Sequence, residues 1–185
     1  MTQFRFHDVR SAPADAKPLL DSLEKKFGFM PGLYAGLAES PSALKLYLDA
    51  SDAFAKTSFT PIEQQVVLLA VSAENGCEFC VGAHSFIARQ MVKAPSPVVD
   101  ALRARTTLPD PRLNALATFT RKVVRERGRV SKADVDTFVA AGFTRAQVLE
   151  TIMGVSIKTL SNYANHILET PLNREFATEA WRRSA

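Results

Sequence analysis

Cysteine is scarce in this chain of 185 residues, which contains only Cys77 and Cys80. Histidine is nearly as rare, with His7, His84 and His166. Two cysteines exclude a framework of several structural disulfides. A chain of this length buries roughly 70% of the surface that its unfolded form exposes, so neither a disulfide nor a metal is needed for folding. The two cysteines are therefore free to serve a chemical function.

The sequence also lacks a run of about 20 apolar residues, and its first seven residues, MTQFRFH, lack the apolar run of a signal peptide. A glycine-rich dinucleotide fingerprint is missing as well. We therefore expect a single domain over residues 1–185 that is cytoplasmic, has no membrane partner, and binds no nucleotide cofactor.

Positive charge is concentrated in the second half. Residues 101–185 contain fourteen Lys or Arg against eight Asp or Glu, and the densest run is RKVVRERGR at residues 121–129. A nucleic-acid surface is one interpretation. The other is a solvated helix end, where cations favour the helix dipole and Gly128 ends the helix. No groove-reading motif accompanies the charge, so we expect no nucleic-acid partner.

Proline and glycine divide the chain into helical segments, and no segment has a convincing strand pattern. Ser40, Thr60, Asp110, Ser131 and Thr144 are placed as helix caps. The sequence predicts an all-α, bundle-like fold of about eight helices. They are expected over residues 18–27, 41–56, 61–74, 80–91, 97–104, 111–127, 132–141 and 144–167.

A faint internal repeat has an offset of 84 residues, which aligns Thr60 with Thr144, Leu68 with Ile152 and Phe79 with Tyr163. Chance similarity between two amphipathic helices is one explanation. The other is a duplicated helix pair, whose second copy would bring residues 162–166 near the cysteines.

The most informative stretch is NGCEFCVGAH, residues 75–84. Asn75-Gly76 breaks the chain, so both thiols are expected in the first turn of the next helix. Residues three apart face each other across one turn, which allows Cys77 and Cys80 to form a disulfide. His84, four residues after Cys80, is expected beside its sulfur. A thiol at a helix N-terminus beside an imidazole has its thiolate favoured.

Three interpretations of this cluster stay open. A redox dithiol needs two close thiols, one with a lowered pKa, and a nearby acid or base. A zinc site needs about four ligands, so His166, His7 or a carboxylate would have to join the three residues of the motif. An inert apolar pair is the third. A CxxC pair without secretory features favours redox chemistry.

The run from residue 58 to residue 90, SFTPIEQQVVLLAVSAENGCEFCVGAHSFIARQ, resembles the core of the AhpD-like alkylhydroperoxidase and carboxymuconolactone decarboxylase family. Two flanking segments are similar to the peroxidase-related branch of that family. They are FGFMPGLY at residues 27–34, and NYANH with TPLN at residues 162–166 and 170–173. The resemblance covers about residues 20–180.

The resemblance implies an all-helical, homo-oligomeric subunit that reduces organic hydroperoxides without a metal or other cofactor. It implies that Cys80 attacks the peroxide and that Cys77, the more exposed thiol, resolves the sulfenic acid. Cys77 would then accept electrons from an external dithiol or a thioredoxin-like reductant. His84 would relay protons.

The chain departs from the family pattern at two positions. The family's glutamate, twelve residues before the first cysteine, is Gln65 here, and its histidine between the cysteines is Phe79. Gln65 can orient His84 by a hydrogen bond but cannot take a proton, so activity is expected to be weaker or redirected. Glu63 lies about 200° around the helix from Gln65 and is a poor substitute. His166 is either a hydrogen-bonded core or interface residue or a member of the site.

Aromatic residues flank the motif in sequence, and they form either ordinary core or an apolar pocket for a hydroperoxide: Phe27, Phe29, Tyr34, Phe79 and Phe86, with Leu37. The apolar run over residues 152–160 exceeds what one helix face needs and favours oligomerisation. The leading functional hypothesis is a thiol peroxidase. The alternatives are a non-enzymatic redox sensor or scaffold, and a lactone decarboxylase in which the dithiol would be idle.

Overall fold

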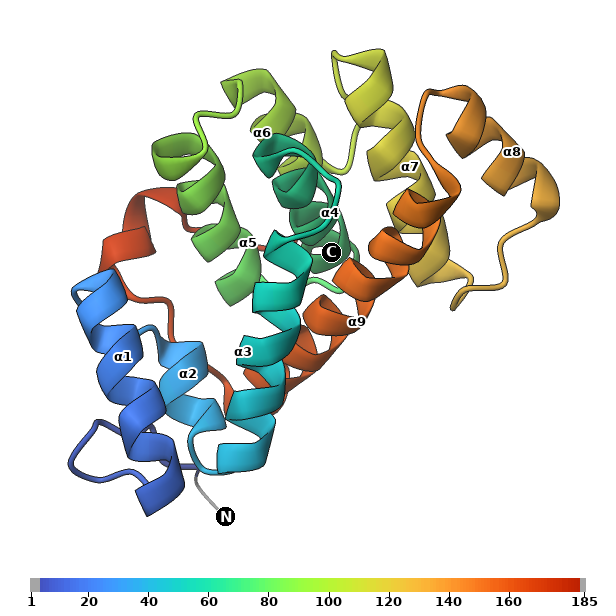
Figure 1. Ribbon diagram of the computed structural model, residues 1–185. Coiled ribbons are helices and arrows are strands. Elements are labelled where there is room, and N and C mark those ends of the chain that lie inside the picture. The colour runs from blue at the N-terminus through green and yellow to red at the C-terminus, as the bar shows by residue number, and fades with distance from the viewer. Residues whose placement is uncertain (1–3, 184–185) are drawn as a thin grey trace.

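The computed structural model describes residues 4–183, and within that range it contains helices and no strand (Figure 1). The all-α prediction is therefore confirmed. The longer helices are α1 (Lys17–Phe27), α2 (Gly32–Leu37), α3 (Pro41–Ala55), α4 (Pro61–Glu74), α5 (Glu78–Phe86), α6 (Ser96–Ala104), α7 (Pro111–Arg125), α8 (Lys132–Ala140) and α9 (Arg145–Leu168). Short helical turns are η1 (Ala14–Ala16), the π-helical η2 (Ile87–Met91) and η3 (Arg174–Glu179).

Polar caps begin five of these helices at the predicted positions. The side chains of Ser40, Thr60, Asp110, Ser131 and Thr144 each accept a hydrogen bond from the backbone N–H three residues later. An N-cap of this kind stabilises a helix by about 1 kcal/mol. Helix α2 was not expected, because six residues are too few to display a helical period. The predicted helix over residues 80–91 begins earlier, at Glu78, and its last turn widens into the π-helical η2.

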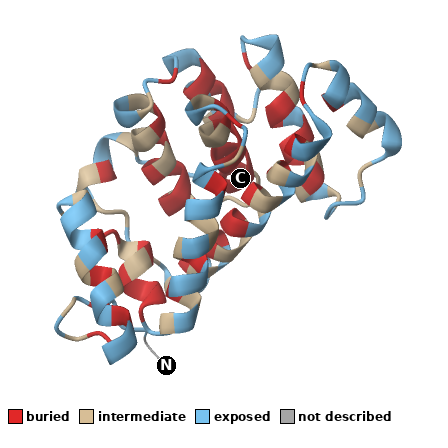
Figure 2. Cartoon of the chain, in the orientation of Figure 1, coloured by how far each residue is buried: buried red, intermediate tan, exposed pale blue. Residues whose placement is uncertain are grey.

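Helix α4 is the centre of the fold. It contacts α5, α6, α7 and α9, and almost its whole length from Val66 to Ala73 is buried (Figures 1 and 2). A helix surrounded on all sides has no polar face, which explains why residues 66–73, VVLLAVSA, are apolar apart from Ser72, whose hydroxyl donates to the Leu68 carbonyl. Gly154 allows α9 to approach closely, because a Cβ there would lie 2.6 Å from Cγ1 of Val67.

The internal repeat reproduces the start of a helix but not a helix pair. Helices α4 and α9 both begin with a capping box, at Thr60 and Thr144. The first copy then turns at Asn75-Gly76, where Gly76 has a φ of 68° that favours glycine. The second copy has Thr159 and Leu160 there, so α9 continues without a break for 24 residues. Its C-terminal half consequently runs along α5.

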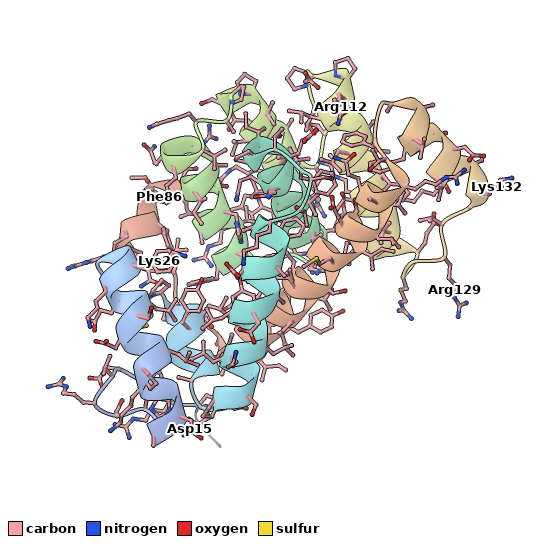
Figure 3. All side chains as sticks on the ribbon, in the orientation of Figure 1. Asp15, Lys26, Phe86, Arg112, Arg129 and Lys132 are labelled. Carbon is pink, nitrogen blue, oxygen red and sulfur yellow. The ribbon has the colours of Figure 1, made fainter. Side chains whose placement is uncertain are left out.

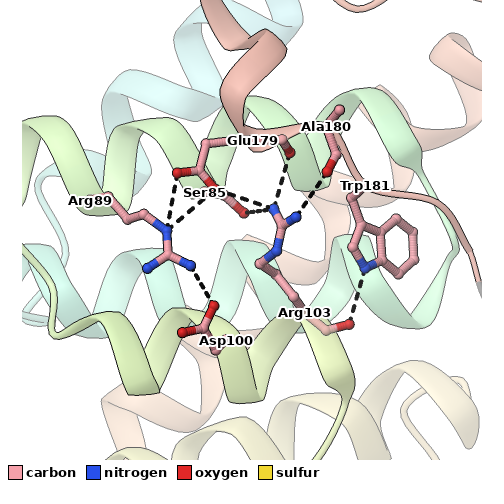
Figure 4. A network of polar contacts seen from close by, with 7 residues as sticks. All are labelled: Ser85, Arg89, Asp100, Arg103, Glu179, Ala180 and Trp181. Carbon is pink, nitrogen blue, oxygen red and sulfur yellow. Dashed lines mark hydrogen bonds and ion pairs between the residues drawn. The ribbon is translucent and has the colours of Figure 1, made fainter.

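The segment after α9 returns along α5 and is fastened by a network of polar contacts (Figure 4). The Glu179 carboxylate pairs with Arg89 at 3.1 Å and with Arg103 at 3.5 Å. Arg103 also donates to the backbone oxygens of Glu179 and Ala180, at 3.0 and 2.9 Å, and Trp181 donates to the Arg103 carbonyl at 3.2 Å. The segment is thereby held as a fixed wall beside the dithiol helix.

The basic run at the end of α7 is largely engaged in ion pairs. Arg125 binds Glu74 of α4 at 2.8 Å, and Lys122 binds Asp134 of α8 at 2.5 Å. Arg129, on the loop between α7 and α8, and Lys132, the first residue of α8, extend outward (Figure 3). Between residues 4 and 183, no helix combines the length and apolar character needed to cross a membrane.

Candidate active site

The two cysteines lie at the start of α5, as predicted. Cys77 is the N-cap residue and Cys80 is the third residue of the helix, and both are free thiols. Each is only 1% exposed. The expectation that Cys77 is the more exposed thiol is therefore wrong, because the end of α9 and residues 180–183 cover the turn that holds it.

The two sulfurs share one proton unequally. Burial opposes ionisation of Cys80, but a hydrogen bond from the Cys77 thiol and the charge and hydrogen bond of Lys158 outweigh it, so the pKa of Cys80 lies well below its ordinary value. The same hydrogen bond to Cys80, together with burial, raises the pKa of Cys77 far above its ordinary value. Cys80 is thus the thiolate and Cys77 the thiol, which is the division of roles that a nucleophile and a resolving thiol require.

Lys158 of α9 is the cation of the site, and it was not among the residues that the sequence predicted there. Its side chain is buried at 1% exposure, and Nζ lies 3.0 Å from Nε2 of His84. An ammonium group can only donate hydrogen bonds, so Nε2 accepts and Nδ1 carries the imidazole proton. Burial and the positive charge of Lys158 hold the pKa of His84 well below its ordinary value, which makes the imidazole neutral.

Gln65 completes a chain of hydrogen bonds. Nδ1 of His84 donates to Oε1 of Gln65 at 3.0 Å, so the predicted contact between these residues is present. Among the described residues, His84 and Cys80 share no direct hydrogen bond, and Lys158 joins them instead. The chain therefore runs from Gln65 through His84 and Lys158 to the Cys80 sulfur.

Two asparagines of α9 also surround the thiolate. Nδ2 of Asn165 donates to the Cys80 sulfur at 3.2 Å, and Oδ1 of Asn162 accepts from Asn75 at 2.9 Å. Both asparagines are buried, at 4% and 0% exposure. Lys158, Asn162 and Asn165 follow the i, i+4, i+7 spacing of one helix face. That polar stripe on a largely apolar helix was the available sequence signal.

Two cavities border the dithiol, one on each sulfur. The Cys80 cavity has a volume of about 70 Å³ and also contains His84 and Lys158 in its wall. Burial raises the pKa of Tyr34 and Tyr47 there, so both phenols stay protonated. The Cys77 cavity is larger, about 700 Å³, and more polar. The remaining wall of the Cys80 cavity is mostly apolar: Phe27, Pro31, Leu33, Phe79, Ala83, Ile87 and Phe176.

Of the aromatic residues that flank the motif, some line the Cys80 cavity and others pack behind its wall. Phe27, Tyr34 and Phe79 line the Cys80 cavity. Phe29 and Phe86 pack against Phe176, which forms another part of its wall, with ring centres 5.5 and 5.4 Å apart. Leu37 is an ordinary core residue.

Comparison with known proteins shows which family the chain resembles. The profile of the Carboxymuconolactone decarboxylase family matches residues 41–122. The alkylhydroperoxidase AhpD core of an uncharacterized peroxidase-related protein from Ralstonia eutropha JMP134 is 26% identical, with a TM-score of 0.82 over 95% of this chain and 96% of that one. The chain has the AhpD-like fold, and its residues 41–122 are similar to the Carboxymuconolactone decarboxylase family.

More distant structures share the AhpD-like fold. A peroxidase-related protein from Silicibacter sp. TM1040 is 18% identical, with a TM-score of 0.80 over 95% of each chain. The debrominase Bmp8, in complex with 2,3,4-tribromopyrrole, is 14% identical, with a TM-score of 0.79 over 97% of this chain and 96% of that one. At these identities the likeness concerns the fold alone. No curated protein matches the sequence.

The remaining candidate residues of this AhpD-like protein lie outside the hydrogen-bond chain. His166 is exposed, stacks on Tyr163 with ring centres 6.5 Å apart, and lines the Cys77 cavity, so it is neither a core residue nor a member of the relay. Glu63 caps α4 and pairs with Arg112 at 3.0 Å. His7 binds Glu39 at 2.9 Å. In the described part of the chain no three His, Cys, Asp or Glu side chains are grouped to hold a metal.

Proposed function

We propose that this AhpD-like protein is a thiol-dependent peroxidase that uses Cys80 as nucleophile and Cys77 as resolving thiol. The observation that carries the proposal is a buried thiolate held by a buried ammonium inside a small, mostly apolar cavity. Thiolate, rather than thiol, is the nucleophilic form of cysteine. A structural cysteine pair would not require a cation buried against one of its sulfurs.

In the first step the Cys80 thiolate attacks the terminal oxygen of the hydroperoxide. The S–O bond forms as the O–O bond breaks, sulfur is oxidised to sulfenic acid, and the other oxygen leaves as alkoxide or hydroxide. Lys158 is the donor that lies against the sulfur, so it supplies the proton that this leaving group needs. Neutral His84 accepts a hydrogen bond from Lys158 and keeps its ammonium aimed at the reacting atoms.

In the second step the Cys77 sulfur attacks the sulfenic sulfur of Cys80. The S–S bond forms, the S–O bond breaks, and hydroxide leaves as water with the proton of the Cys77 thiol. Lys158, neutral after the first step, is the base that passes this proton on. An external dithiol then supplies two electrons and two protons, which restore the Cys77 thiol, the Cys80 thiolate and the Lys158 ammonium.

The size of the Cys80 cavity favours small hydroperoxides. Its volume of about 70 Å³ is roughly half that of an engineered cavity of about 150 Å³ that binds benzene. Hydrogen peroxide and short alkyl hydroperoxides therefore fit, whereas the ring of an aromatic hydroperoxide does not. Within the predicted class of organic hydroperoxides, the substrate is at the short-chain end.

Hydroperoxide consumption with dithiothreitol as reductant tests the proposal. We expect wild type to turn over hydrogen peroxide and Cys80→Ser to lose turnover entirely. In the same assay without dithiothreitol, Cys77→Ser should consume one equivalent per subunit and stop, because a sulfenic acid that meets no other thiol accumulates. A Cys80→Ser protein that consumes peroxide as fast as wild type would falsify the assignment of the nucleophile.

The same variants separate the alternatives. A lactone decarboxylase would convert a carboxymuconolactone equally well in the double Cys→Ser protein. A redox sensor would change its size on gel filtration between reducing and oxidising buffer, with no sustained turnover. We expect neither behaviour.

A further inference from the structure

The two sulfurs of the dithiol are in the walls of different cavities. The Cys80 cavity contains the reacting sulfur, Lys158 and His84, and Cys77 is absent from its wall. Cys77 instead lines the cavity between the start of α5, the end of α9 and residues 180–183. That cavity, at about 700 Å³, lies within the range of roughly 300–1,000 Å³ that is typical of small-molecule sites. The peroxide and the reductant can therefore reach the disulfide from separate sides.

The wall of the Cys77 cavity is held in place before any ligand arrives. Residues 180–183 form one side of the cavity, and hydrogen bonds to Arg103 hold this segment (Figure 4). Arg103 donates to the backbone oxygens of Glu179 and Ala180, and Trp181 donates to the Arg103 carbonyl. A site built in advance binds a small ligand without the entropy cost of ordering a loop.

The wall of the Cys77 cavity contains two acids, Glu78 and Glu169, and two arginines, Arg182 and Arg183, and of these Arg183 is the group that suits a ligand carboxylate. Arg182 pairs with Glu78 at 2.6 Å and so is already neutralised. Arg183 lies over the Asn75-Gly76 turn, with Nη1 3.2 Å from where a Cβ on Gly76 would sit. Across residues 4–183 no acidic side chain forms an ion pair with the Arg183 guanidinium. Its planar fork is therefore free to take a ligand carboxylate beside Cys77.

We propose that the Cys77 cavity is the reductant site and that it takes a low-molecular-weight thiol of about tripeptide size that carries a carboxylate. This inference rests on the proposed function, because it assigns the step that reopens the Cys77–Cys80 disulfide. The cavity volume fits a small molecule, and the 1% exposure of Cys77 leaves its sulfur out of reach of a protein reductant that docks on the surface.

The chemistry of disulfide exchange is consistent with this direction of approach. A ligand thiolate attacks the Cys77 sulfur, a mixed disulfide forms, and the Cys80 sulfur leaves as thiolate with the bonding pair. Exchange is faster when the leaving thiolate is the more stable one, and Lys158 stabilises Cys80. A second thiol then attacks the ligand sulfur of the mixed disulfide, which releases the Cys77 thiol and the oxidised ligand.

Mapping the mixed disulfide tests the site directly. The protein is oxidised with diamide, so the test does not depend on peroxidase activity, and is then mixed with glutathione and quenched with acid. Peptide mass spectrometry should find glutathione on Cys77. Glutathione attached to Cys80, or equally to both cysteines, would overturn the proposal and leave the peroxidase assignment intact.

Reduction kinetics of the diamide-oxidised protein test the recognition of carboxylate. Arg183→Ala should slow reduction by glutathione about two- to fivefold, the effect of one exposed charge pair, and should not change reduction by uncharged 2-mercaptoethanol. Arg183→Lys should restore most of the rate, and Arg10→Ala, outside the cavity wall, is the matched control. Equal slowing with both thiols, or no slowing with glutathione, would refute the site. So would rapid reduction by thioredoxin with none by glutathione.

Discussion

Replacing Lys158 by Met tests the electrostatic part of the account. Methionine keeps the length of the side chain and removes only the ammonium that contacts Cys80 and His84. An opposite charge within about 4–6 Å lowers the pKa of an acid by about 1–3 units, and each unit is a factor of ten in thiolate once the pKa exceeds the pH. We therefore expect the reaction of Cys80 with hydrogen peroxide at pH 6 to slow about 10- to 1,000-fold.

The assay is the rate of Cys80 alkylation by iodoacetamide against pH, in a Cys77→Ser background so that one thiol reports. The Lys158→Met profile should shift to higher pH, and Lys158→Arg, which keeps a cation, should shift less. Folding is a separate measurement, because replacing a buried charge by an apolar residue is often neutral for stability. An alkylation profile that does not move in Lys158→Met would refute the reasoning.

Three further predictions concern the cavity, the relay and pH. Phe176→Ala enlarges the Cys80 cavity and should raise kcat/KM for cumene hydroperoxide roughly tenfold relative to hydrogen peroxide. Phe143→Ala changes the core outside that cavity and should leave this ratio unchanged. Gln65→Glu places a carboxylate against Nδ1 of His84. It should raise the pKa of His84 by about 1–3 units in an NMR titration and raise turnover roughly 3- to 30-fold. A His84 titration that does not change would contradict the contact. Because the pKa of His84 is lowered in the folded state, the unfolded state binds a proton first as pH falls below about 6.5. The free energy of unfolding, measured in guanidinium, should therefore drop by up to about 1.4 kcal/mol per unit as pH falls below about 6.5. An equally steep drop in His84→Leu would show that another group causes this loss of stability.

Local signals in the sequence were sufficient for most of the fold. Capping residues such as Thr60 and Thr144 marked helix starts correctly, because the hydrogen bonds of a cap involve residues only three apart. The same locality placed Cys77 and Cys80 one turn apart. Helix α2 was missed because six residues carry no period, whereas the long helix α9 was predicted correctly over residues 144–167, where no breaker interrupts the run.

The site could be predicted only where its contacts are local. The contact between Gln65 and His84 followed from the family resemblance, whereas Lys158 was hidden in an apolar run that was interpreted as an oligomer surface. Within that run Lys158 faces the cysteines, whereas Ile152 is exposed at 44%. Homo-oligomerisation through such residues stays a prediction.

The exposure of Cys77 could not be judged from the motif. Its cover comes from Arg182 and Arg183, more than 100 residues later, and from the end of α9. Burial created by distant segments depends on how the whole chain packs, and nothing in the CxxC spacing encodes it.

Trapping of a sulfenic acid shows whether Cys80 is a thiolate that attacks hydroperoxide. Cys77→Ser protein is mixed with one equivalent of hydrogen peroxide at pH 6 in the presence of dimedone, which traps sulfenic acid. The modified residue is then identified by mass spectrometry. We expect one adduct per subunit, on Cys80, and loss of that adduct when Lys158→Met is added to the same protein. A Cys77→Ser protein that forms no adduct, while Cys80→Ser forms one on Cys77, would contradict this expectation.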